Sequence, residues 1–133
     1  MNALKVNFAG PKAVSIDWNQ KISGGSAVAQ RAGISVMTRQ GSDKFLPDRG
    51  TQVTNALFSY GVFDLQSMQH VLNFGGLKAR SDMQDDEAIT RAPEDRVAAV
   101  RLTLIGVKDN SAQVGIQVTN QAGQTTKEIT SIT

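Results

Sequence analysis

The titratable side chains are where catalysis would be expected, and they are scattered along this chain. The single histidine, His70, has no acidic residue three or four positions away, so a helix would give it no carboxylate partner. Hydrolysis of a glycosidic bond uses two carboxyl groups roughly 5–9.5 Å apart. The isolated candidates are Asp17, Asp48, Asp64 and Glu94, and no motif brings two of them together. These patterns predict no catalytic residue.

Metal and phosphate chemistry has no better support. The acidic residues at 82–87 lack the alternating ligands and the glycine of a calcium-binding loop. We interpret them as the solvated start of a helix, where negative charge is favourable. The chain has no cysteine, which excludes thiolate ligands, disulfides and a cysteine nucleophile. Neither Gly24-Gly25 nor Gly75-Gly76 continues as a phosphate-binding loop. We therefore expect no metal and no cofactor.

Length and composition fit one globular domain, residues 1–133. Hydrophobic residues make up 40% of the chain and charged residues 20%, which is ordinary for a soluble protein. The 14 basic and 12 acidic residues form no basic stripe, so we expect no nucleic-acid partner. No apolar run is long enough to span a membrane, and no leader is visible. We expect no membrane partner, and assembly in the cytoplasm.

The first 25 residues are expected to be extended. Apolar and polar residues alternate from Leu4 to Phe8 and again at Val14 and Ile16, and Gly10-Pro11 is a turn signal between them. This pattern predicts short strands, or an extended N-terminal arm over residues 1–25.

Two helices separated by a loop are predicted next. Ser26 is a candidate cap for a helix from Ala27 to near Arg39. Residues 41–50 are rich in turn formers, and we expect their Phe45 to pack inward. A short helix follows over residues 51–59, with Val53, Leu57 and Phe58 on its buried side.

A longer helix should begin after Asp64, a candidate cap. Its apolar stripe comprises Leu65, Met68, Val71, Leu72 and Leu77. The pair Gly75-Gly76 predicts a kink or a break. Ser81 and Gln84 resemble a capping box that would restart the helix, which places the acidic cluster near a positive helix end.

The C-terminal third changes to a period of two. Apolar residues alternate with polar ones around 100–105, 114–118 and 126–132, and turn formers separate the segments. The pattern predicts an antiparallel β-meander of about three strands with one apolar face. The expected fold class is therefore α+β, with N-terminal helices packed on a C-terminal antiparallel sheet.

Several of these segments form an ordered set. They are Ile16-Asp17-Trp18-Asn19, Val36 to Ser42, Phe45-Leu46-Pro47-Asp48-Arg49-Gly50, the helix from Thr51 to Phe58, and Pro93-Glu94-Asp95-Arg96 before the first strand. This set resembles the lysozyme-like baseplate wedge family of contractile phage tails. Its members are also called sheath initiators, with relatives in type VI secretion baseplates. Two departures stand out: Pro93 precedes Glu94 with Asp95 inserted, and Arg49 replaces an apolar or aromatic residue.

The resemblance implies a structural protein of the virion that is not an enzyme. The family's Glu-Pro-Arg signature engages a helical bundle of other baseplate wedge proteins. Carried over, this assigns partner binding to Pro93, Glu94 and Arg96. Without the resemblance, the same residues read as a helix stop followed by a surface ion pair.

The resemblance also implies that the chain presents a strand edge to the tail sheath protein. We expect the terminal strand to fill this role by β-augmentation, with Thr125, Lys127, Ile129 and Ser131 at the contact. Tail geometry suggests about six copies per baseplate. Two alternatives stay open: an adaptor that binds the tube or hub of a non-contractile tail, and a peptidoglycan hydrolase.

Overall fold

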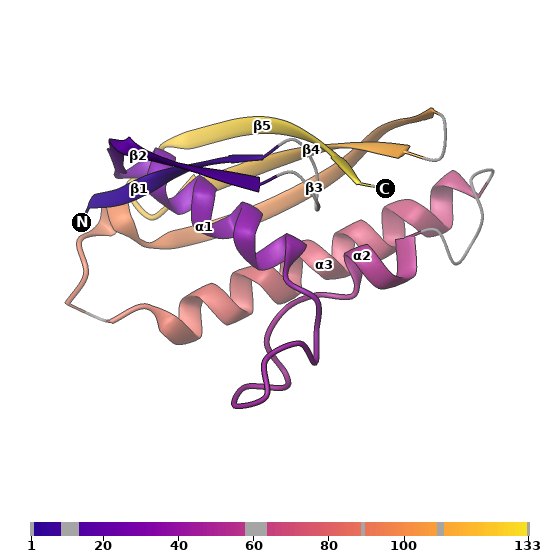
Figure 1. Cartoon of the computed structure of the whole chain (residues 1–133), viewed down its shortest axis with the longest axis horizontal. Helices are drawn as coiled ribbons and strands as arrows, with labels where there is room; N and C mark the ends of the chain where they lie inside the picture. Colours follow the sequence, from indigo (N-terminus) through magenta and orange to yellow (C-terminus); the bar gives the residue numbers. More distant parts are fainter. Residues whose placement is uncertain (1, 9–13, 58–63, 89, 109–110, 133) are drawn as a thin grey trace.

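The protein folds into an antiparallel sheet with helices packed on one of its faces (Figure 1). The computed structural model describes residues 2–8, 14–57, 64–88, 90–108 and 111–132, with side chains from residue 24 onward except Asn55. The sheet contains β3 (Val97–Lys108), β4 (Ser111–Asn120) and β5 (Thr125–Ile132), in that order. The helices are α1 (Gly25–Met37), α2 (Val53–Ala56) and α3 (Leu65–Asp86). The α+β architecture and the three-stranded meander are confirmed.

The N-terminal segment forms a second, separate sheet. β1 (Asn2–Phe8) and β2 (Val14–Ser23) pair antiparallel, with a register shift between Leu4 and Lys5. Both strands contact α1. The strands predicted from the alternation are therefore confirmed, while the Gly10-Pro11 turn lies outside the described residues.

The hydrophobic core lies between the sheet and the helices. Alternate residues of β4 are buried and β4 contacts α1, while β3 contacts α3. Val28, Ala32 and Val36 of α1 and Met68 and Leu72 of α3 have at most 2% of their surface exposed. Predicted burial is also confirmed for Val53 and Leu57, whereas Phe58 lies outside the described residues. Leu65 and Leu77 depart from the predicted stripe, because they are 52% and 60% exposed.

The glycine pair of α3 does not interrupt the helix, so the predicted break is wrong. A Cβ on Gly75 would lie 2.3 Å from Cγ2 of Val53, and one on Gly76 would lie 2.9 Å from the carbonyl oxygen of Val100. The glycines are therefore needed for close approach of α3 to α2 and β3. Since α3 continues to Asp86, the predicted capping box at Ser81 does not form.

Two further local predictions are wrong. The acidic cluster lies at the C-terminal end of α3, where the helix dipole disfavours it, and basic side chains from other segments offset that cost. Ser26 does not cap α1, because the helix begins at Gly25, two residues earlier than predicted, with Gly24 at the N-cap. Gly24 has a φ of 61°, a left-handed conformation that favours glycine.

Candidate partner-binding surfaces

The outer edge of β5 is formed by alternate residues of the strand. The backbone N–H of Asn120 donates to the carbonyl of Gln124 at 3.0 Å, which makes this pair the hydrogen-bonded end of the β4–β5 hairpin. Hydrogen-bonded and non-hydrogen-bonded pairs then alternate along the ladder. The backbone groups of 126, 128, 130 and 132 therefore face β4. Those of Thr125, Lys127, Ile129 and Ser131 face away from the sheet.

The sequence-predicted edge residues are these same four. β5 is the last strand of its sheet, and no described residue is hydrogen-bonded to its outer side. Their side chains stand on the face of the sheet opposite the helices, where Ile129 is 70% exposed and Thr125 and Lys127 are exposed. The opposite face of the strand is fixed by burial, because Thr130 and Ile132 belong to the interior. The strand is thus held in the fold, and its outer backbone groups have no hydrogen-bond partner among the described residues.

The outer edge of β3 is covered instead. Gln69 of α3 donates its amide N–H to the carbonyl of Leu102 at 3.0 Å and accepts from the N–H of Leu104 at 2.8 Å. The paired residues of β4 turn their own backbone groups toward β5, so these two groups of β3 must face outward. One glutamine side chain therefore occupies the positions that a neighbouring strand would use.

The start of β3 is covered as well. The N–H of Val97 donates to the Glu87 carboxylate at 2.8 Å, and its carbonyl accepts a longer, 3.4 Å bond from the Gln121 side chain. Arg31 of α1 donates to the same Glu87 oxygen at 3.0 Å. The Glu87 side chain is 1% exposed. A partly buried ion pair therefore joins α1, the end of α3 and the start of β3.

The Pro93–Arg96 turn lies directly before β3 and is anchored through its backbone. Pro93–Asp95 form a single 3-10 turn, η2, with the proline at its first position. The carbonyl of Glu94 accepts from the Asn120 side chain at 3.0 Å, and the carbonyl of Asp95 accepts from Arg31 at 2.6 Å. These contacts leave the Glu94 side chain exposed.

Arg96 is less exposed than Glu94, which precedes it by two residues. Its side chain is half-buried, and its Nε has no hydrogen-bond partner in the described part of the chain. The carbonyl of Arg96 accepts from the N–H of Gln121 at 2.9 Å. The predicted residues Glu94 and Arg96 thus lie on one turn whose backbone is fixed by hydrogen bonds. The Glu94 side chain is exposed, and the Arg96 side chain is half-buried.

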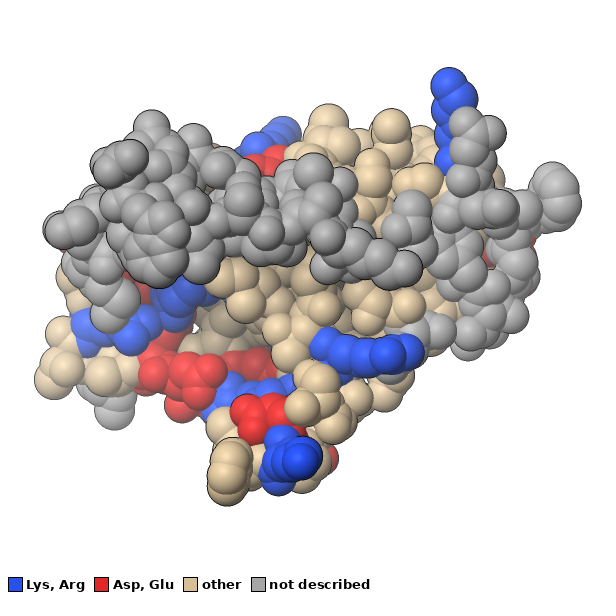
Figure 2. All heavy atoms as spheres, in the orientation of Figure 1, with Lys and Arg blue, Asp and Glu red and all other residues tan. Residues whose placement is uncertain are grey.

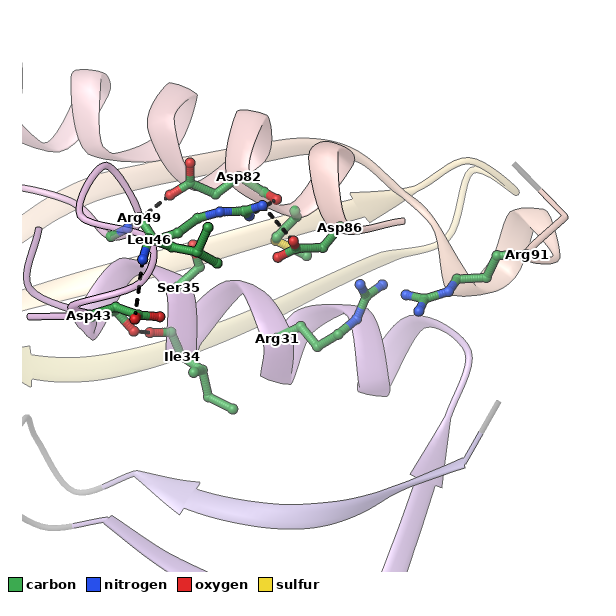
Figure 3. Close-up of a pocket in the computed structure, with 12 residues that line it drawn as sticks. Arg31, Ile34, Ser35, Asp43, Leu46, Arg49, Asp82, Asp86 and Arg91 are labelled. Carbon is green, nitrogen blue, oxygen red and sulfur yellow. Dashed lines mark hydrogen bonds and ion pairs between the residues drawn. The ribbon is translucent and has the colours of Figure 1, made fainter. Parts of the chain in front are cut away.

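The 41–50 loop is tied to the end of α3 and borders a pocket of about 380 Å³ (Figure 3). Arg49 donates to the Asp82 carbonyl at 2.7 Å and pairs with Asp86 at 2.6 Å. The N–H of Gly50 donates to the Asp82 carboxylate at 2.9 Å. On the face shown in Figure 2, acidic and basic side chains lie next to one another in this region.

The expectation that Phe45 packs inward is wrong. Its side chain is 93% exposed, and its neighbour Leu46 is 50% exposed. The Asp43 carboxylate accepts the N–H groups of both residues, at 2.9 and 3.3 Å, which directs the turn outward.

The carboxylates and the histidine considered for catalysis do not converge in the described structure. Asp48, Glu94 and His70 are exposed on separate elements, and the side chain of Asp17 is not among those described. Asp64 caps α3 by accepting from Ser67 Oγ at 2.8 Å and from Ser67 N–H at 3.1 Å. These bonds hold the pKa of Asp64 below its ordinary value. Within the described residues, no group of three or more acidic or histidine side chains is placed to hold a metal ion.

Comparisons with known proteins add no relative. No family model, no curated protein and no solved structure matches the chain. None of the described helices is both long and apolar enough to cross a membrane.

Sequence reasoning missed the residues that close the β3 edge. Gln69 lies beside buried Met68 on α3, and Asn73, four residues later, accepts from its amide at 2.8 Å, so a local partner was available to it. Glu87 and Arg31 are 56 residues apart. A polar residue next to the apolar stripe of a helix was the only available signal, and it does not say which strand that residue would meet.

Proposed function

We propose that this chain is a structural component of a contractile phage tail baseplate. It links baseplate wedge proteins to the first ring of tail sheath protein and templates sheath assembly by accepting a strand along β5. The placement in a baseplate rests on the ordered set of sequence segments from Ile16 to the C-terminal strands. The mechanism rests on the contrast between the two sheet edges.

The single observation that carries the mechanism is that one edge is covered and the other is open. Gln69 and Glu87 occupy three outward backbone groups of β3, which are the N–H groups of Val97 and Leu104 and the carbonyl of Leu102. In the described chain, no equivalent side chain serves Thr125, Lys127, Ile129 or Ser131. An unpaired strand edge accepts another strand through main-chain hydrogen bonds. A three-stranded sheet that is open along β5 and partly covered along β3 favours strand addition on one of its sides, as the start of a directional polymer requires.

The Pro93–Arg96 turn supplies the second contact, to the wedge proteins. Glu94 projects from a turn whose backbone is fixed by Asn120 and Arg31. A charged side chain on a rigid turn sets register and partner choice more than affinity. Reversing its charge with Glu94→Lys should leave the fold intact and prevent incorporation into baseplates. If the Glu94→Lys variant is incorporated at the wild-type level, Glu94 does not take part in the contact with the wedge proteins.

The strand-addition mechanism is tested by placing proline at neighbouring positions of β5. The N–H of Ile129 faces outward, so Ile129→Pro removes one donor from the open edge while the β4 ladder keeps its bonds. The N–H of Glu128 faces β4, so Glu128→Pro is the matched control that damages the fold itself. Deleting the strand would be a poorer test, because Ile132 is fully buried.

The readout is sheath growth from baseplates that carry each variant, counted by electron microscopy. Baseplates with Ile129→Pro should be complete and bare of sheath, whereas Ile129→Val should behave as wild type. Glu128→Pro should lower the thermal unfolding midpoint of the purified chain. Full-length sheaths on baseplates with Ile129→Pro would contradict strand addition at β5.

A further inference from the structure

Two adjacent residues carry all the charge of the open β5 edge. Lys127 and Glu128 lie in the middle of the strand and both are exposed, while its other residues are Thr, Ile or Ser. Successive side chains of a strand point to opposite faces, so Lys127 lies on the outer face of the sheet and Glu128 on the face that carries the helices. The edge therefore presents one positive and one negative charge, each on its own face.

Neither charge is neutralised by the neighbouring strand. The β4 residue opposite Lys127 is Gln117, which is uncharged. The residue opposite Glu128 is Ile116. In the described part of the chain, Lys127 and Glu128 form no ion pair. Opposite charges directly across two strands attract and like charges repel, so a strand that adds to β5 is placed to supply both counter-charges.

We propose that the strand added to β5 is an extended segment of the tail sheath protein in which a basic residue is directly followed by an acidic one. The inference rests on the strand addition proposed above. The three pairs among the described strands are all antiparallel. In an antiparallel addition, the basic residue lies opposite Glu128 and the acidic residue after it lies opposite Lys127. Residues directly opposite have Cβ atoms about 4.5–5.5 Å apart, which lets their charged groups pair.

The adjacent charges also fix the register of the added strand. A slip by one residue sets an acidic residue against Glu128 or a basic residue against Lys127. A slip by two residues moves both charges of the partner opposite uncharged residues of β5. Main-chain hydrogen bonds supply the affinity of an added strand, and the two charges select its sequence and its alignment.

A second copy of β5 does not meet this requirement. Its outward backbone groups belong to the residues on the outer face of the sheet, and Lys127 is the charged one among them. Antiparallel pairing of two β5 edges therefore sets Lys127 against its equivalent in the other copy, or against uncharged Thr, Ser and Ile. The same two charges thus favour a different chain and oppose self-association of the open edge.

A probe strand fused to the C-terminus of the full chain tests the charge pairing. An Asn-Gly turn joins the probe to the chain and fixes an antiparallel hairpin and its register along β5. One probe places Lys-Glu opposite the charged pair, and the control places Glu-Lys there in an otherwise identical sequence of Thr and Val. Amide exchange of Lys127, Ile129 and Ser131 is the readout. The Lys-Glu probe should protect these N–H groups at least about threefold more than the Glu-Lys probe, and about 1 M salt should remove most of the difference.

The exchanged variant, Lys127→Glu combined with Glu128→Lys, supplies the matched second arm. Both side chains are exposed, so its unfolding midpoint should stay near that of wild type. In this variant the Glu-Lys probe should protect better, a reversal that an effect of probe sequence on strand propensity would not produce. Equal protection by both probes would overturn the charge pairing and leave strand addition at β5 in place. Protection by neither probe would contradict strand addition itself, so the results distinguish failure of this inference from failure of the proposed function.

Discussion

The two edges of the same three-stranded sheet are treated in opposite ways. On β3, side chains from α3 and from the β4–β5 turn occupy the outward backbone groups. On β5, the outward groups of four residues have no partner among the described residues. β3 is the more apolar of the two strands, but an apolar side chain supplies no partner for an outward backbone group. An edge is covered where a helix packs beside it and places polar side chains opposite the outward backbone groups of the strand.

Keeping one edge open has a cost that the molecule limits. An unpaired edge invites pairing with any extended chain. The outward residues of β5 are mostly polar, and Lys127 places a charge near the middle of the strand. With Val97, Leu102 and Leu104 of β3 already bonded, edge pairing by the three-stranded sheet is favoured on the β5 side. A protein that must accept one specific strand and avoid open-ended aggregation needs this combination.

The largest effect on the closed edge is expected at Glu87. Glu87→Ala removes the acceptor that Arg31 and the N–H of Val97 share, and Arg31 keeps only its bond to the Asp95 carbonyl, so the fold should be destabilised by about 1–3 kcal/mol. Glu87→Gln keeps one acceptor oxygen and should cost less. Urea unfolding at neutral pH measures both. Equal midpoints for Glu87→Ala and wild type would show that this end of β3 does not need its cover.

Opening the middle of the β3 edge should have a smaller but more telling effect. Gln69→Leu leaves the Leu102 carbonyl and the Leu104 N–H unpaired, at a cost of about 1–3 kcal/mol. It also creates a second open edge, so light scattering at high concentration should reveal aggregation. Gln66→Leu, at an exposed position on the same helix, is the matched control. Aggregation by both variants alike would attribute the effect to surface hydrophobicity instead.

The close approach of α3 to β3 can be tested at Gly76. Helix propensity alone predicts that Gly76→Ala stabilises α3 by about 1 kcal/mol. The added Cβ would lie 2.9 Å from the Val100 carbonyl oxygen, so we expect a net loss of about 1–3 kcal/mol instead. Ser81→Ala, at an exposed position of α3, reports propensity without the clash. A rise in the thermal midpoint of Gly76→Ala would mean that the helix can move away from the edge it covers.

The smallest effect is expected at the far end of α3, where Asp64 caps the helix. Its pKa is lowered by the hydrogen bonds from Ser67. The carboxylate therefore stabilises the fold fully above the unfolded pKa, near the ordinary value of 3.8, and this contribution disappears as the pH falls through the lower folded pKa. Asp64→Asn keeps a capping oxygen without a titrating charge. The difference in unfolding free energy between wild type and Asp64→Asn should shrink on acidification. A constant difference would contradict a stabilising role for the charge of Asp64.

The sequence predicted the elements and not the contacts between them. Alternation at 114–118 identified β4, and the Asp64 cap was correctly placed, because both signals are local. Gly75 and Gly76 were misread as a break, since their small size serves α2 and β3, which are distant in the sequence. Phe45 was expected inside on hydrophobicity alone, and Asp43 overrides that preference. The four outward residues of β5 were predictable from its period of two, whereas the cover over β3 was not.

Amide hydrogen exchange, resolved by residue, tests the contrast between the edges most directly. In the free chain, the N–H groups of Lys127, Ile129 and Ser131 should exchange near the rate of an unstructured peptide. Those of Glu128 and Thr130 on the same strand, and of Val97 and Leu104 on the covered edge, should be protected. Assembly with sheath protein should then protect the first three. Slow exchange at Lys127, Ile129 and Ser131 in the free chain would contradict an open β5 edge and the strand addition that depends on it.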